Sequence, residues 1–137
     1  MKIVFFGLDY LGATDAACLL TEDHKVAGIN VRADKTAPII VGLFPVSEPG
    51  LEDLLAAGPE DGWLSADTYV GGQLEDADMA MTCVGGPSLM DSGLDLIQVG
   101  AVSEVLSVAL KTRDPVHDPL IVTCRSIMYP GAMEEVV

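Results

Sequence analysis

Short apolar segments, each followed by a glycine turn, alternate along this sequence with stretches of helical periodicity. Residues 2–6 (KIVFF) form the first such segment, and Gly7 follows it directly. Residues 10–20 then carry apolar side chains at helical spacing, and residues 25–31 (KVAGINV) are apolar again. A strand, a helix and a strand in succession form a βαβ unit with parallel strands and a right-handed crossover. The beginning of the chain therefore predicts a parallel α/β sheet.

The rest of the chain continues the alternation. Helices are predicted at residues 34–43, 47–58 and 94–110, and strands at residues 68–70, 79–84 and 120–124. We therefore expect a single α/β domain over residues 1–137, a Rossmann-like, doubly wound parallel sheet in a three-layer αβα arrangement. In such sheets, ligands bind at the carboxyl ends of the strands, where the strand order reverses.

Charge and hydropathy exclude two classes of partner. The 21 acidic and 7 basic residues give a formal net charge of -14, which is unsuited to binding a nucleic-acid backbone. The apolar runs fall short of the roughly 18 to 20 residues that cross a bilayer, so no membrane partner is expected. No signal-peptide pattern opens the chain, which favours a cytoplasmic location.

The cysteines and histidines do not form a recognisable chemical motif. Cys18, Cys83 and Cys124 are widely spaced among apolar neighbours, so we expect them to be small core residues. His24 and His117 lie far apart without a second ligand at metal spacing. The sequence therefore predicts neither a metal site nor a catalytic triad.

The first glycine turn resembles the fingerprint of dinucleotide-binding folds. Gly7 and Gly12 occupy the positions that allow the tight turn and the close packing of the helix on the strand. Asp9 occupies the position where glycine normally lets the backbone approach a pyrophosphate, and its carboxylate would repel that group. Alternatively, Asp9 is an ordinary N-cap residue that stabilises the helix by about 1 kcal/mol.

Two other strand ends could contact a dinucleotide. Asn30 stands where an acid usually accepts hydrogen bonds from the adenosine ribose, and Arg32 and Lys35 follow. An amide next to an arginine leaves NADP open as a cofactor besides NAD; alternatively, Asn30 begins a turn and the cations are solvated. Gly85, Gly86 and Pro87 would let a ligand lie against bare backbone, or they form only a turn.

Six segments in order, FGLDYLGA, GINV, SEPGLEDLL, CVGGPS, GLDL and CRSIMYPG, resemble the N-terminal domain of the UDP-glucose/GDP-mannose dehydrogenase family, nearest its GDP-mannose branch. The resemblance extends over residues 1–137. It implies an NAD-dependent oxidoreductase that oxidises a sugar-nucleotide C6 alcohol to a carboxylate in two hydride transfers. The family's catalytic cysteine lies in later regions, and none of Cys18, Cys83 and Cys124 matches its motif. We therefore assign no catalytic residue here and expect the chain to be inactive alone.

The resemblance also implies roles for individual residues. Tyr10 and Leu11 would contact the pyrophosphate through their backbone, Asn30 would contact the adenosine ribose, and Lys35 would lie beside it. Ile127 stands where the family places a hydroxyl-bearing residue near the cofactor.

Four positions, Asp9, Asn30, Gly86 and Ile127, depart from the family pattern. The departures support an alternative interpretation, in which the domain is a non-catalytic relic or an assembly module with a degraded pocket. The family's dimerisation and sugar-nucleotide domains are not recognised in the chain, and its cofactor domain continues for a further strand and helix. We therefore expect a truncated sheet edge that a companion chain or a second copy covers.

Overall fold

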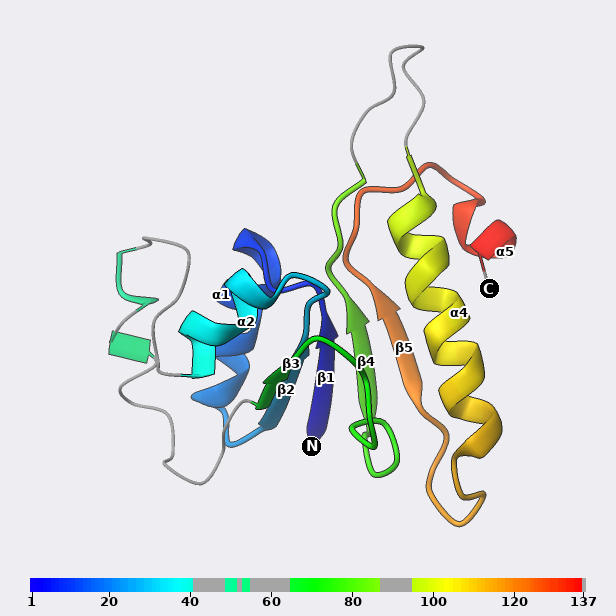
Figure 1. Ribbon diagram of the computed structural model, residues 1–137, viewed down its shortest axis with the longest axis horizontal. Helices are drawn as coiled ribbons and strands as arrows, with labels where there is room; N and C mark the ends of the chain where they lie inside the picture. The colour runs from blue at the N-terminus through cyan, green and yellow to red at the C-terminus, as the bar shows by residue number, and fades with distance from the viewer. Residues whose placement is uncertain (41–48, 52, 55–64, 87–94, 137) are drawn as a thin grey trace.

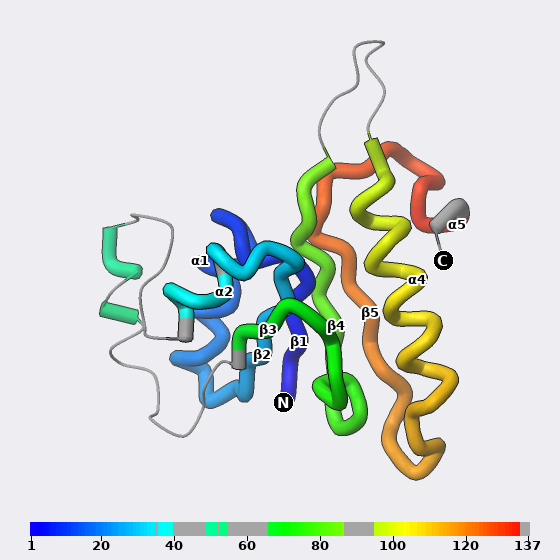
Figure 2. Tube along the Cα trace, in the orientation of Figure 1, coloured from blue at the N-terminus to red at the C-terminus, as the bar shows by residue number. Residues whose placement is uncertain are grey.

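The structure is a computed structural model that describes residues 1–40, 49–51, 53–54, 65–86 and 95–136 (Figures 1 and 2). Within these ranges, five parallel strands form one sheet in the order β3-β2-β1-β4-β5. The strands are β1 (Lys2–Phe6), β2 (Lys25–Ile29), β3 (Ser65–Asp67), β4 (Met79–Thr82) and β5 (Ile121–Cys124). The helices are α1 (Tyr10–Leu20), α2 (Ala33–Ile40), α4 (Ile97–Thr112) and α5 (Ala132–Val136).

Strand β1 lies at the centre of the sheet because its side chains are apolar on both faces. Ile3 and Phe5 pack into one buried cluster with residues of α1 and α2. Val4 and Phe6 pack into a second cluster on the opposite face, where Leu106 of α4 covers the sheet. The predicted three-layer α/β architecture is confirmed, and Figure 1 shows α1 and α2 on one side of the sheet and α4 on the other.

The prediction of a strand at residues 68–70 is wrong, because the strand is β3, at Ser65–Asp67. Its register places Ser65 beside Ala27 and Asp67 beside Ile29. The Asn30 amide then donates to the Asp67 carbonyl at 3.0 Å. The Asp67 carboxylate accepts the Thr68 amide hydrogen at 2.7 Å, so the chain turns away from the sheet after Asp67.

Two helix predictions were close but inexact, and a third lies mostly outside the described residues. Helix α2 begins one residue earlier than predicted, and residues 41–43 of that prediction lie outside the described ranges, as does most of the segment 47–58. Helix α4 spans residues 97–112 instead of 94–110. Its start is fixed by the Asp95 carboxylate, which accepts the Ile97 amide hydrogen at 2.9 Å.

The prediction that all three cysteines lie in the core is wrong for Cys18, which is exposed. Helix α1 packs on the sheet through a face of small residues and one leucine: Gly12, Ala13, Ala16, Ala17 and Leu20. Cys18 lies on the opposite side of the helix, so its apolar sequence neighbours do not predict its burial. Cys83 is buried, as predicted, and Cys124 is partly exposed.

Arg113 connects two loops at the amino edge of the sheet. Its guanidinium group donates to the carbonyls of Leu74 and Ala77 in the segment that precedes β4, the latter at 2.8 Å. It also donates to the Asp118 carbonyl, at 2.9 Å, in the segment that leads into β5. One half-buried cation therefore links the two chain segments that enter neighbouring strands.

We expect Arg113→Ala to lower the free energy of unfolding by about 2 to 4 kcal/mol, because charge-assisted hydrogen bonds are lost and buried carbonyls remain without a donor. Urea denaturation followed by circular dichroism measures this change. Arg32→Ala serves as the control, since its ion pair with Asp34 is exposed on both sides and contributes little to stability. Equal effects of the two substitutions would contradict the proposed role of Arg113.

Among the described residues, no helix has both the length and the hydropathy that a membrane span requires.

Candidate functional site

The strand order reverses between β1 and β4, and the turns that follow these two strands lie side by side. The Cys83 amide donates to the Phe6 carbonyl at 2.7 Å, and the Gly7 amide donates to the Ile29 carbonyl at 2.8 Å. These bonds extend the sheet by one residue beyond β1 and β4. The first glycine turn is thereby held at the switch point, where doubly wound sheets bind their ligands.

Gly7 and Gly12 are required by the geometry of this turn. Gly7 has a φ of +96°, and a Cβ atom there would lie 2.9 Å from the backbone carbonyl group of Cys83. A Cβ atom on Gly12 would lie only 2.0 Å from the Gly7 carbonyl oxygen. The absence of both side chains lets the start of α1 lie directly against the end of β1. The roles predicted for these two glycines agree with the structure.

Asp9 occupies the N-cap position of α1, but its side chain makes no capping hydrogen bond. The N-cap interpretation is therefore right about position and wrong about the bond. The Asp9 backbone is extended, with φ -76° and ψ -163°, so this position does not need glycine for conformational reasons. The exposed carboxylate lies close enough to raise the pKa of Arg32 slightly, after the larger effect of Asp34. Asp9 thus adds negative charge where a helix N-terminus normally attracts an anion.

The end of β2 is arranged by Asn30, which is buried. Its side-chain oxygen accepts the Arg32 amide hydrogen at 3.1 Å and so begins the turn into α2. The Arg32 guanidinium forms two hydrogen bonds with the Asp34 carboxylate, Nη2 to Oδ2 at 2.7 Å and Nε to Oδ1 at 3.2 Å. The hydrogen bonds and charge of Asp34 raise the pKa of Arg32. The backbone of Lys35 lies in the first turn of α2.

The ends of β4 and β5 form the other half of the switch point. Gly85 has open space around its Cα, whereas a Cβ on Gly86 would lie 3.2 Å from the Ile127 carbonyl oxygen. The Ser126 hydroxyl donates to the Val84 carbonyl at 2.7 Å and joins these two loops. Ile127 itself is 76% exposed. Pro87, also predicted to lie at this site, falls outside the described residues.

A recess of about 430 Å³ opens between α1 and the ends of β4 and β5. Its lining residues are Leu11, Met81, Thr123, Cys124, Arg125, Ser126 and Ile127. Arg125 forms an ion pair with Asp15 of α1, which raises the pKa of Arg125. This pair joins residues 110 positions apart, and no sequence motif indicated it. The recess therefore includes two predicted site residues, Leu11 and Ile127, together with Arg125, whose ion pair with Asp15 sequence reasoning missed.

Cys83, which lies next to the first glycine turn, has an unusually weakly acidic thiol. Burial, and to a smaller extent the charge of Asp15, raises the pKa of the Cys83 thiol from 9.0 to about 12. The Cys83 thiol ionises at lower pH in the unfolded chain than in the folded one. Its effect on the free energy of unfolding is therefore constant below about pH 9, and the free energy of unfolding falls as the pH rises from about 9 toward 12.

We expect Cys83 to resist iodoacetamide at pH 8, reacting on the order of a hundredfold more slowly than exposed Cys18. Peptide mass spectrometry after timed labelling measures the two rates in the same sample. Unfolding in urea should remove the difference, which makes the denatured protein the control. Equal labelling of the native cysteines would show that Cys83 is not shielded.

No group of three or more potential metal ligands occurs within the ranges that the structure describes.

The parallel sheet in the order β3-β2-β1-β4-β5, with a glycine-bounded turn leading into a helix at its switch point, defines a dinucleotide-binding α/β domain. The chain belongs to the UDP-glucose/GDP-mannose dehydrogenase family, whose NAD binding domain matches residues 1–137. The predicted fold and family are therefore confirmed.

Individual relatives support the same assignment. GDP-mannose 6-dehydrogenase of Pseudomonas aeruginosa is 37% identical over 137 residues, which are 100% of this chain and 31% of that protein. UDP-glucose 6-dehydrogenase of Bacillus subtilis is 31% identical over 123 residues, or 90% of this chain and 27% of that protein. A crystal structure of a ternary complex of GDP-mannose dehydrogenase from Pseudomonas aeruginosa has a TM-score of 0.91 at 36% identity and covers 100% of this chain and 31% of its own. The chain thus spans less than a third of the length of these relatives.

Proposed function

We propose that this domain binds NAD(H) at the switch point between β1 and β4, with an affinity that Asp9 reduces. The observation that carries the proposal is the contact between Gly7 and the start of α1, which exposes the helix N-terminus to the crevice. Helix N-termini of this kind bind phosphate groups through their amide hydrogens. The tight turn from Gly7 to Gly12 brings the first amides of α1 to the carboxyl edge of the sheet, where they could bind a pyrophosphate, whereas the Asp9 carboxylate opposes its charge.

Each part of the cofactor has proposed partners. The pyrophosphate would lie against the backbone of Tyr10 and Leu11, between Gly7 and Gly12. The adenosine ribose would lie near Asn30, Arg32 and Lys35. The nicotinamide half would extend toward Gly85, Gly86, Pro87 and Ile127, beside the recess at the ends of β4 and β5. When bound, NAD supplies a hydride acceptor, and these residues position it.

Binding is tested by isothermal titration calorimetry with NADH. We expect saturable binding with a dissociation constant in the high micromolar to millimolar range, weakened from ordinary dehydrogenase affinity by Asp9. Gly85→Leu would place a side chain in the proposed binding region and should abolish binding. Gly100→Leu, at an equally open position on α4, is its matched control. No saturation up to about 5 mM NADH would overturn the proposal.

The residues at the end of β2, where the adenosine ribose would lie, favour binding of both NAD and NADP. Neutral Asn30 lacks the carboxylate that would repel a 2′-phosphate, and Arg32 lies two residues away. The Arg32 pair with Asp34 is exposed on both sides, so exchanging it for a phosphate costs little. We expect NADPH to bind at least as tightly as NADH, and Asn30→Asp to favour NADH by roughly tenfold, as calorimetry would show. A wild-type preference for NADH that Asn30→Asp leaves unchanged would contradict this role.

In a longer polypeptide like the relatives, we propose that this domain presents NAD to a nucleotide sugar whose C6 alcohol is oxidised to a carboxylate. The catalytic groups would then come from outside residues 1–137, so this chain alone should show no turnover with GDP-mannose or UDP-glucose. The alternative function is that of a non-catalytic relic or an assembly module, for which Asp9 is the supporting observation. Failure of NADH binding in both the wild type and Asp9→Gly would favour that alternative.

A further inference from the structure

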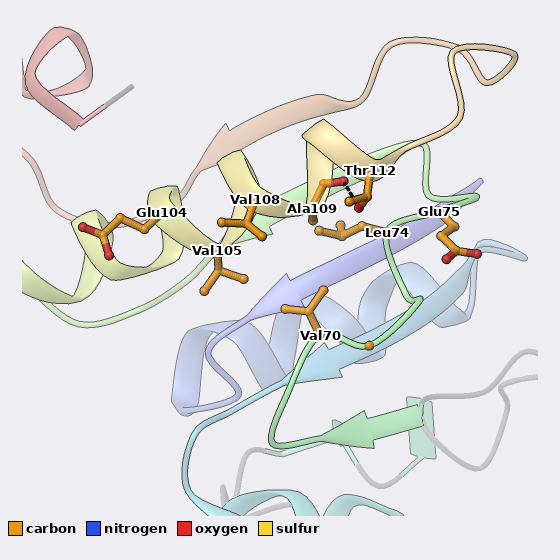
Figure 3. Close-up of a pocket in the computed structure, with 9 residues that line it drawn as sticks. Val70, Leu74, Glu75, Glu104, Val105, Val108, Ala109 and Thr112 are labelled. Carbon is orange, nitrogen blue, oxygen red and sulfur yellow. Dashed lines mark hydrogen bonds between the residues drawn. The ribbon is translucent and has the colours of Figure 1, made fainter.

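Two recesses of the molecule differ in the charge of their walls. The first has a volume of about 450 Å³ and lies between α4 and the turn after β3, and Figure 3 shows Val70 of that turn facing Val105 of α4. Its charged lining residues are Glu75 and Glu104, whose carboxylates oppose a ligand that carries phosphates. The recess at the ends of β4 and β5 contains Arg125 instead. The second recess is therefore the one whose charge suits the proposed cofactor.

Arg125 links the end of β4 with α1. Its backbone amide donates to the Thr82 carbonyl at 2.8 Å. Its guanidinium group donates to the Asp15 carboxylate through Nε and through Nη2, and the Nη2 to Oδ1 distance is 3.3 Å. The Asp15 side chain is 22% exposed, so the acid of this ion pair is largely shielded from water. Because Asp15 lies one turn after Leu11 on the same side of α1, Arg125 holds the part of α1 that lines the recess.

The residues that follow Arg125 are joined to the turn after β4. The Ser126 hydroxyl donates to the Val84 carbonyl at 2.7 Å. The Ile127 carbonyl oxygen lies 3.2 Å from the position that a Cβ atom on Gly86 would take, so the two loops lie in close contact. Contacts therefore run from α1 through Arg125 to both loops at the nicotinamide side of the proposed site.

We propose that Arg125 is a positioning residue, whose ion pair with Asp15 holds the loops after β4 and β5 in the place that the nicotinamide half of NAD(H) needs. This inference rests on the proposed function. Gly7 and Gly12 place the start of α1 against β1 without Arg125, so the adenosine and pyrophosphate half of the site does not depend on the ion pair. Without the pair, the loops would occupy the binding position for a smaller fraction of the time, and the apparent affinity for NADH would fall by that fraction.

Calorimetric titration with NADH and with ADP-ribose tests this division of the site. ADP-ribose carries the same pyrophosphate charge as NADH and lacks the nicotinamide. Arg125→Gln and Asp15→Asn each break the ion pair with little change in side-chain size. We expect each variant to raise the NADH dissociation constant about three- to fivefold, as the loss of a partly exposed ion pair allows, and to leave that of ADP-ribose within about 1.5-fold of the wild type.

The two single variants change the net charge in opposite directions. If the charges acted only by attracting or repelling the phosphates of the cofactor, Arg125→Gln would weaken NADH binding and Asp15→Asn would tighten it. Loss of the ion pair weakens binding in both. The double variant Asp15→Arg with Arg125→Asp re-forms the pair with its charges exchanged, and it should return the NADH dissociation constant to within about twofold of the wild type.

Loss of a different ion pair is the matched control. Lys2 pairs with Asp76 at the amino edge of the sheet, away from the strand ends that form the proposed site. Lys2→Gln should leave the dissociation constants of both NADH and ADP-ribose unchanged. Circular dichroism confirms that each variant remains folded.

Hydrogen exchange in the absence of cofactor tests whether the ion pair holds the loop after β5. Arg125→Gln should speed amide exchange in residues 125–128 about threefold or more and leave residues 2–6 of β1 unchanged, because only the loop is released. Unchanged exchange in residues 125–128 would overturn the inference.

The titrations separate this inference from the proposed function. The positioning role of Arg125 would be overturned, with the proposed function intact, if Asp15→Asn bound NADH as tightly as the wild type or more tightly. It would also be overturned if the single variants lost NADH and ADP-ribose affinity equally, or if the charge-exchanged variant bound NADH no better than they do. Failure of both the wild type and Asp9→Gly to bind either ligand would overturn the proposed function and this inference together.

Discussion

Asp9→Gly is expected to tighten NADH binding by about ten- to a hundredfold. The estimate follows from removing one negative charge at about 4 Å from a phosphate, which is worth roughly 1 kcal/mol in water and about 4 kcal/mol at an effective dielectric constant of 20. Because the Asp9 side chain is exposed, the lower part of this range carries more weight. Calorimetric titration of both proteins under identical salt conditions measures the change.

Two further variants separate the causes of this effect. Asp9→Asn keeps the size of the side chain and removes its charge, so it measures the electrostatic part alone. Glu22→Gln removes one charge in the turn between α1 and β2, at the opposite edge of the sheet, and controls for net charge. Should Asp9→Gly bind NADH no more tightly than Glu22→Gln, the carboxylate would not be what weakens the site.

Gly12→Ala is expected to lower the free energy of unfolding by about 3 to 5 kcal/mol. Helix propensity alone would favour alanine at this position of α1 by about 1 kcal/mol. The tertiary contact reverses the sign, because the added Cβ would lie 2.0 Å from the backbone oxygen of Gly7. Neither backbone segment can rotate away as a side chain could, so the helix must shift from the strand. Urea denaturation followed by circular dichroism measures the loss.

Gly100→Ala is the matched control for this prediction. Gly100 also lies within a helix, but an added Cβ there would meet nothing within 4 Å. We expect this substitution to raise the free energy of unfolding by up to about 1 kcal/mol. If the two substitutions changed the free energy of unfolding similarly, the start of α1 could move away from the Gly7 carbonyl at little cost, and the contact at Gly12 would not constrain the helix.

Much of the fold follows from local patterns in the sequence. The limits of β1 and α1 coincide with the predicted ones, because the periodicity is strong and glycine or polar residues bound each segment. The place of the glycine turn at the carboxyl edge of the sheet also follows, since a βαβ unit has only one common handedness. The predicted glycine roles needed no knowledge of distant residues.

Strand β3 and the exposure of Cys18 could not be predicted in this way. Strand β3 is only three residues long and exists because β2 offers it hydrogen-bond partners. Cys18 is apolar in its sequence context, but the sheet covers only the opposite side of α1.

Sequence patterning fixes the order of helices and strands and the glycine-bounded turn, since both depend on residues a few positions apart. Tertiary structure alone places Arg125 beside Asp15, Asn30 beside the end of β3, and the Val70 turn beside α4. Those neighbours are distant in sequence and meet only because parallel crossovers bring the strand ends to one edge. The charge and shape of the site therefore arise from the packed sheet, and the residues that shape them carry no local signal.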